Sequence, residues 1–288
     1  MSLSLFLVQV FNGLQYGLIL FLIASGLTLI FGIMGIINLA HGAFYMLGAY
    51  VAFGIAQSSG SLVLAVLGAV ATMAALGFVI ERVLIGRLYN RNHLDQVLIT
   101  FGLILVFDEA QRIIWGSDVH SVAIPPALSS SFQVSDIMAF SYYRIFVTVV
   151  CAVLAVTMAL VIQKTKLGMW IRAGASNREM VSSLGVDINM LFALVFAAGA
   201  ALTGFAGAIS VPLTSVSPGM GDAIIIISFV VVVIGGVGSI KGAFFGALLI
   251  GLADTFGRVL LPQFSSFLVY AIMAGVLLWR PQGLFARA

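Results

Sequence analysis

Apolar stretches of about 20 residues recur along the whole chain. A helix of that length crosses a bilayer's hydrocarbon core of about 30 Å. Of the 288 residues, 62% are hydrophobic and only 8% are charged, whereas soluble domains carry about 25% charged residues. The sequence therefore predicts an all-α fold, a polytopic transmembrane helical bundle. The first apolar stretch is expected to be a retained span rather than a removable signal, because no cleavage site follows it.

Nine spans are expected, and a count of eight or ten also fits the pattern. Glycines interrupt the apolar runs at 32–42 and 235–242, which leaves a broken or re-entrant helix possible at both places. Residues 1–288 are expected to form a single transmembrane domain. The predicted spans are Leu5–Phe31, Ile36–Ala56, Leu62–Ile85, Val97–Trp115, Ile145–Ile162, Leu191–Val211, Ala223–Gly236, Ala243–Leu260 and Phe264–Trp279.

The loop charges predict the orientation, because Lys and Arg are retained on the cytoplasmic side of a membrane. They gather after the third span, after the fifth span and in the C-terminal tail, which holds Arg280 and Arg287. Residues 117–143 contain Asp118 and Asp136 but no Lys or Arg. We therefore expect an external loop at 117–143, a cytoplasmic loop at 164–190 and a cytoplasmic C-terminus.

Small residues recur four positions apart on several spans. Helices in lipid associate by bringing their backbones close together, which small side chains permit. A tightly packed bundle is expected from this pattern, and its clearest members are Gly13, Gly17, Ala200, Gly204, Ala208, Gly242 and Gly246.

The motifs of enzymes are missing from the sequence. The glycine-rich stretch at 235–239 lacks the Lys-Ser/Thr pair that would hold a nucleotide phosphate and magnesium. The three histidines fall in different segments, and there is one cysteine, so neither a metal site nor a redox centre is predicted. No catalytic residue is assigned, and a membrane-embedded enzyme stays only as an alternative.

Charged residues occur near the predicted outer ends of two spans. Asp108 and Glu109 lie four and three residues before Arg112, and Asp254 lies four residues before Arg258. Both spacings allow a pair on one helix face. Structural ion pairs, docking contacts and solute binding remain possible roles. An isolated carboxylate near a span's midpoint, which an ion-coupled carrier would use, is not evident.

The cytoplasmic segment KTKLGMWIRAGASNREMVSSLGVDIN is too patterned for a flexible linker. Ser176 or Asn177 is predicted to cap a short helix over Arg178–Leu184 that Gly185 ends. Its Met180, Val181 and Leu184 form an apolar stripe that fits either a groove on a partner protein or the lipid surface. The candidate residues of this segment are Ala175, Ser176, Asn177, Arg178, Glu179, Met180, Val181, Leu184 and Gly185.

The stretch GIINLAHGAFYMLGAY places Asn38 and His41, followed by Gly42, inside an apolar region. The surrounding glycines weaken the helix, so we expect a chain break in which Asn38 caps the outgoing helix. His41 is expected either to form a hydrogen bond to a neighbouring span or to line a solute path together with Asn38 and Gly42.

Four motifs in order, INLAHGAFYMLGAY, RAGASNREMVSSLGVD, GGVGSIKGAFFGALLIG and RPQGLF, span the chain. Together they resemble the permeases of branched-chain amino-acid ABC importers, most closely the LivH-type subunit. The resemblance is less specific for the solute, because related permeases for urea, amides and other amino acids are similar.

The resemblance implies a permease subunit in the bacterial inner membrane that carries leucine, isoleucine or valine. It implies four further subunits: a homologous LivM-type permease, two ABC ATPase subunits and a periplasmic solute-binding protein. ATP and Mg are then bound by the ATPase subunits and no cofactor by this chain, and nucleic acid is not among the expected partners. The family's coupling helix corresponds to Ala175–Gly185, which favours the partner groove over the lipid surface. The external loop becomes a candidate platform for the solute-binding protein, and an ion-coupled secondary carrier is the competing class of function.

Overall fold

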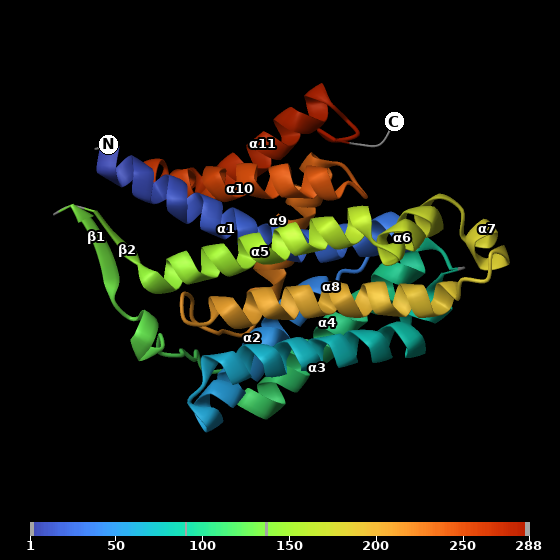
Figure 1. Ribbon diagram of the computed structural model, residues 1–288, viewed down its shortest axis with the longest axis horizontal. Coiled ribbons are helices and arrows are strands. Elements are labelled where there is room, and N and C mark those ends of the chain that lie inside the picture. The colour runs from blue at the N-terminus through green and yellow to red at the C-terminus, as the bar shows by residue number, and fades with distance from the viewer. Residues whose placement is uncertain (1–2, 90, 136–137, 286–288) are drawn as a thin grey trace. The chain divides into compact units, whose positions relative to one another are not determined.

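The structure, a computed structural model, describes residues 3–89, 91–135 and 138–285. Asp136 and Arg287, which entered the charge argument above, lie outside the described residues. The described chain is mainly helical (Figure 1). Its elements are α1 (Leu3–Leu29), η1 (Ile30–Met34), α2 (His41–Ser59), α3 (Leu62–Val83), η2 (Ile85–Leu88), α4 (His93–Trp115), η3 (Pro126–Leu128), β1 (Ser131–Ser135), β2 (Met138–Ser141), α5 (Tyr142–Lys164), α6 (Lys166–Ser176), α7 (Arg178–Ser183), α8 (Ile188–Ser210), α9 (Met220–Gly235), α10 (Ile240–Leu260), η4 (Pro262–Phe264) and α11 (Ser265–Trp279).

Each predicted span corresponds to a helix, and the polytopic helical bundle is confirmed. Six helical segments among the described residues are long and apolar enough to cross a membrane, and α9 is a shorter apolar helix. Those six are Leu3–Met34, Leu62–Leu88, Tyr142–Lys164, Ile188–Ser210, Ile240–Leu260 and Pro262–Trp279. The count of nine crossings stays a prediction.

The chain divides into two compact units; three of the four boundaries fall inside α1, α5 and α9, and the fourth lies in the loop between α4 and η3. The first unit comprises Met1–Ala24, Ile124–Thr157 and Ile227–Ala288, and the second comprises Ser25–Ala123 and Met158–Ile226. The single transmembrane domain expected from the sequence stays a prediction.

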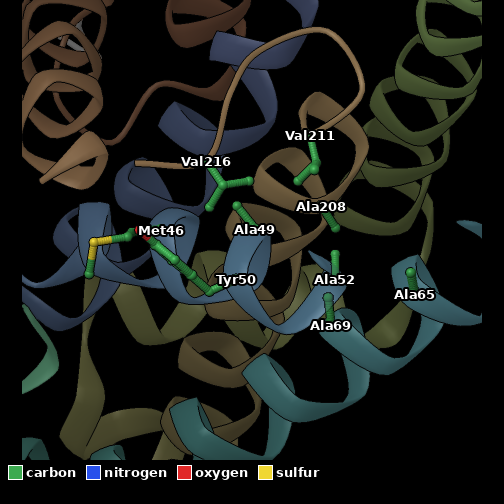
Figure 2. Packing of buried hydrophobic residues seen from close by; sticks show 9 residues of the cluster. All are labelled: Met46, Ala49, Tyr50, Ala52, Ala65, Ala69, Ala208, Val211 and Val216. Carbon is green, nitrogen blue, oxygen red and sulfur yellow. The ribbon is translucent and has the colours of Figure 1, made fainter. Parts of the chain in front are cut away.

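In the second unit, α2, α3 and α8 pack directly against one another. Alanines from all three helices meet in a buried cluster (Figure 2), completed by larger side chains such as Tyr50. A Cβ added at Gly48 would lie 2.5 Å from the Cα of Gly204 on α8. The close approach expected from small residues is confirmed, because at this point backbone faces backbone.

In the first unit, α1 and α10 are packed in the same manner. A Cβ added at Gly17 would lie 2.9 Å from the main-chain oxygen of Ala247. The C-terminal tail is held by main-chain bonds, since the N–H of Leu284 donates to the oxygen of Ile234 over 2.8 Å. Arg144 at the start of α5 donates to the side-chain oxygens of Asn12 and Gln15, each at 3.2 Å. A polar cross-link therefore joins α1 to α5 in this unit.

The predicted external loop at 117–143 contains a small antiparallel sheet that the charge argument did not foresee. Ser131 of β1 pairs with Ser141 of β2, and the register is irregular between Gln133 and Ser135. Tyr142 and Tyr143, assigned to the loop, belong to the first turn of α5. The predicted loop is therefore two residues too long at its C-terminal end, because α5 begins at Tyr142.

Candidate functional site

The chain breaks between α1 and α2, as the glycines predicted. The last turns of α1 widen into the π-helix η1, and Gly35 follows with a φ of +67°. This left-handed conformation is accessible to glycine at little cost. Residues 35–40 are not helical, and α2 begins at His41. The predicted start of this span at Ile36 is therefore wrong, because apolar residues continue through a stretch that has left the helix.

Asn38 lies in the broken stretch and is completely buried. It does not cap α2, because Ala40 occupies the N-cap position and makes no side-chain bond there. The main-chain oxygen of Asn38 accepts from the N–H of His41 over 3.4 Å, so the backbone takes the place of the predicted side-chain cap. Neither side-chain polar atom of Asn38 has a hydrogen-bond partner among the described residues.

His41, the first residue of α2, is also completely buried. Its Nε2 lies 2.7 Å from the Oγ1 of Thr203 on α8. The same hydroxyl lies 2.9 Å from the main-chain oxygen of Gly199. Because a hydroxyl has one proton, the arrangement that satisfies both contacts has Thr203 donating to Gly199 and His41 donating to Thr203. Sequence reasoning expected a partner on another span but did not identify Thr203.

Gly42 brings the first turn of α2 against the first turn of α9. A Cβ at Gly42 would collide with the main-chain oxygen of Gly221 and lie 2.7 Å from the Cβ of Ile225. The N-terminal ends of two helices therefore meet, and such ends carry partial positive charge. Asp222 lies in the first turn of α9 and balances part of that charge. The region therefore combines the partial positive charge of two helix ends with the buried side-chain amide of Asn38.

The short helix predicted from its caps is present as α7. Of the two candidate caps, Asn177 is the one that acts: its Oδ1 accepts from the N–H of Met180 over 2.9 Å. Ser176 belongs to the end of α6. Gly185 follows the helix with a φ of +85°, which suits a glycine at a helix end.

The apolar stripe predicted on this helix divides into two parts. Met180 and Leu184 are 63% and 73% exposed, but Val181 is only 5% exposed and packs inward. The expected three-residue stripe is therefore wrong in one member, because i and i+4 lie on one face of a helix whereas i+1 is turned by about 100°. An exposed pair, Met180 and Leu184, remains on the surface.

Arg178, the first residue of α7, is directed toward the chain break. Its Nη2 donates to the main-chain oxygens of Met34 and Ile33, the latter at 3.3 Å. The guanidinium carbon lies 5.2 Å from the ring centre of Phe192 and 6.0 Å from that of Tyr89. Sequence reasoning did not predict these contacts, since an arginine between two spans is ordinarily solvated.

The Tyr89 hydroxyl donates in turn to the carboxylate of Glu81, which is 2% exposed. Burial, and then the bond to Glu81, raises the pKa of Tyr89 above its ordinary value, so the phenol stays protonated and remains a donor. A carboxylate inside the apolar run of the third span was the sequence signal that could have drawn attention to this cluster.

The two predicted groups of charges form ion pairs of unequal quality. Glu109, rather than Asp108, pairs with Arg112, at 3.9 Å between largely exposed side chains. Such a pair contributes little free energy. Asp254 is buried and accepts from the Nε of Arg258 at 2.8 Å. The described residues include no group of three or more His, Cys, Asp or Glu placed to hold a metal ion.

Residues 9–277 match the family described as "Branched-chain amino acid transport system / permease component". The chain belongs to this family. The permease is 33% identical to the high-affinity branched-chain amino acid transport system permease protein BraD of Pseudomonas aeruginosa and 32% identical to LivH of Escherichia coli, with 98% of this chain and 96% of each relative covered. A probable branched-chain amino acid transport permease protein LivH of Methanocaldococcus jannaschii is 30% identical over 93% of this chain and 89% of its own length. No solved structure gives a significant match to the permease.

Proposed function

We propose that this chain is the membrane permease subunit of an ATP-driven importer of branched-chain amino acids. The observation that carries the proposal is its similarity, over nearly the full length of both chains, to permeases named for that transport. The complex would contain a homologous LivM-type permease, two ATPase subunits that bind ATP and Mg, and a solute-binding protein outside the cytoplasmic membrane. In this proposal the chain itself hydrolyses nothing.

The site where the ATPase docks is assigned to α7. The helix is capped at its start by Asn177 and presents two exposed apolar side chains, Met180 and Leu184. A short helix with such a face fits a hydrophobic groove on a partner. The lipid surface was the alternative, and the six-residue length of α7 leaves little apolar area for stable adsorption to a membrane.

The solute path is assigned to the region of Asn38, His41 and Gly42. A zwitterionic amino acid needs partners for its carboxylate and its ammonium group. The N-terminal ends of α2 and α9 suit the carboxylate, and the side-chain oxygen of Asn38 and the carbonyls freed by the break suit the ammonium group. ATP-driven movement of α7 would open this region alternately to the two sides of the membrane.

The proposal is tested by isolating the complex from native membranes and reconstituting it in vesicles. We expect an ATPase to co-purify with the chain and uptake of leucine, isoleucine or valine to require ATP. In the double variant Met180→Asp, Leu184→Asp, the amount of ATPase that co-purifies should fall about tenfold or more, because two charges replace apolar contacts at the centre of the interface. Phe132→Asp serves as the matched control: it places a charge at an exposed apolar position on the predicted external side and should retain the ATPase.

Two outcomes would contradict the proposal. If uptake collapses with a protonophore while ATP remains high, the chain is an ion-coupled carrier. If urea, an amide or another amino acid is carried in place of the branched-chain amino acids, the solute assignment is wrong although the class of transporter stands.

A further inference from the structure

Arg178 joins the predicted coupling helix to the chain break by direct bonds. It is the first residue of α7, and Figure 1 shows α7 beyond the N-terminal end of α8. Its side chain donates to the main-chain oxygens of Ile33 and Met34. Those oxygens belong to the last residues of η1, where a helix runs out of its own donors and its carbonyls need partners from elsewhere. A cation is the preferred partner at such an end.

The guanidinium is held on its faces as well as at its donors. It lies over the rings of Phe192 on α8 and Tyr89 beyond η2, and the bond from Tyr89 to Glu81 fixes the second ring. Within the described residues the hydrogen bonds of Arg178 go to main-chain carbonyls, and ring faces contribute further attraction to the cation. The side chain is therefore fixed by several elements of the second unit, and α7 cannot shift without disturbing them.

The broken stretch begins directly beyond this contact. A Cβ added at Gly35 would lie 3.5 Å from the Nη2 of Arg178, and the non-helical residues 35–40 lead from there to His41. We infer that Arg178 is a positioning residue that transmits displacement of α7 to the break between α1 and α2, and so controls the buried polar region around Asn38. This inference rests on the proposed function, because it requires a partner that moves α7.

The chain provides a matched comparison in Arg172. This arginine lies in α6 of the same cytoplasmic segment, and its Nη1 also donates to a main-chain oxygen. The acceptor is Ile162 near the end of α5, not the break. Replacing either arginine removes the same charge and its bonds to main-chain carbonyls, but only Arg178 connects α7 to residues 33 and 34. Comparing the two variants therefore distinguishes an arginine that only caps a helix end from one that transmits movement.

The experiment compares Arg178→Ala, Arg178→Lys and Arg172→Ala in the complete, reconstituted complex. The readout is solute transported per ATP hydrolysed. Arg178→Ala should keep the ATPase bound and active but lower this ratio by about tenfold, the effect of losing a charge-assisted bond in a partly buried place. The ratio for Arg178→Lys should fall between those of Arg178→Ala and the unmodified complex, because lysine keeps the charge but not the planar guanidinium that stacks on the two rings. Arg172→Ala should keep the unmodified ratio.

A second readout follows the break itself. Leu39→Cys is introduced in a Cys151→Ala background, which removes the chain's one native cysteine, and its rate of thiol labelling is measured with and without a non-hydrolysable ATP analogue. We expect the nucleotide to change this labelling rate when Arg178 is present, including in Arg172→Ala. In Arg178→Ala the nucleotide should leave the rate unchanged.

Equal transport ratios in Arg178→Ala and Arg172→Ala would overturn the inference. So would loss of assembly in both Arg178 variants while Arg172→Ala assembles, since that result makes Arg178 a structural cap alone. If the unmodified complex takes up solute without ATP, the proposed function itself fails and the inference fails with it. The unmodified complex thus distinguishes the two failures.

Discussion

At the scale of single residues, the bond between His41 and Thr203 explains how a histidine is accommodated in an apolar segment. Both side chains are completely buried, and a buried polar group is tolerated when a partner satisfies it. The chain of contacts runs from His41 through the Thr203 hydroxyl to the oxygen of Gly199. The histidine therefore joins the start of α2 to the middle of α8.

Replacing Thr203 by valine tests this bond, because valine has nearly the same shape but cannot accept a hydrogen bond. The ring Nε2–H of His41 would lose the Thr203 hydroxyl as acceptor, and we expect the free energy of unfolding to fall by about 1–3 kcal/mol. Thermal unfolding of the purified complex in detergent measures the change. Thr148→Val is the matched control, since the Thr148 hydroxyl donates to the oxygen of Arg144 within its own helix.

The histidine itself gives a stricter test of the roles assigned to it. His41→Ala should lower protein level or transport, because both the interhelical bond and the candidate path involve this side chain. A variant with unchanged protein level, ATPase coupling and transport would eliminate both roles.

Residue-level contacts were only partly predictable from the sequence. A polar residue among apolar neighbours indicates that some partner exists, which is why His41 and Asn38 were recognised. It does not identify the partner, because Thr203 lies 162 positions away on another helix. Arg178 is predictable as part of α7, but its direction depends on carbonyls that become available because the helix ends at Met34, the last residue of η1.

At the scale of elements, glycine contacts determine how closely the helices of the second unit pack. A Cβ at Gly48 would lie 2.5 Å from the Cα and 2.6 Å from the oxygen of Gly204. Main-chain atoms cannot move aside as a flexible side chain can, so the helices themselves would have to separate.

Gly48→Ala should therefore destabilise the protein by about 2 kcal/mol or more, although alanine favours helix formation. Gly102→Ala is the control, because a Cβ at Gly102 meets nothing within 4 Å. That variant should be neutral or stabilise the helix by up to about 1 kcal/mol. Thermal unfolding and the yield of assembled complex measure both effects, and equal behaviour of the two variants would refute the packing argument.

The helices were predictable because an apolar run of about 20 residues has few alternatives in a membrane. The short helix α7 was predictable from its caps, Asn177 and Gly185. The start of α2 was not, because Ile36 and its neighbours are as apolar as a true span and only the left-handed Gly35 interrupts them. The strands β1 and β2 lie in a loop that was assigned by its charges alone, and charge counts contain no information on strand pairing.

At the scale of the whole molecule, orientation is the property on which the functional argument depends. Residues 117–143 are predicted to face outward and α7 to face the cytoplasm. Single cysteines at the exposed positions Ser130 and Glu179, in the Cys151→Ala background, test this with a membrane-impermeant maleimide. Ser130→Cys should react in cells whose outer membrane alone is permeable to the maleimide. Glu179→Cys should react only after the inner membrane is permeabilised. The reverse pattern would remove α7 from contact with any cytoplasmic ATPase.

The resemblance drawn from four motifs was sufficient to identify the family, and the match over residues 9–277 confirms it. Motifs succeeded at this scale because they are distributed over the whole chain. They could not indicate that the chain forms two compact units, three of whose boundaries fall inside α1, α5 and α9, because a continuous helix shows no composition change at such a boundary.

The glycine contacts of α2 have a consequence for how this protein works. Besides Gly48 against Gly204, a Cβ at Gly207 would collide with the main-chain oxygen of Tyr45. At these two points, on opposite helices, main chain faces main chain, so the helices cannot slide along each other without first separating. We expect α2 and α8 to keep the same position relative to each other during transport. The segment that moves is then the short stretch that precedes α2.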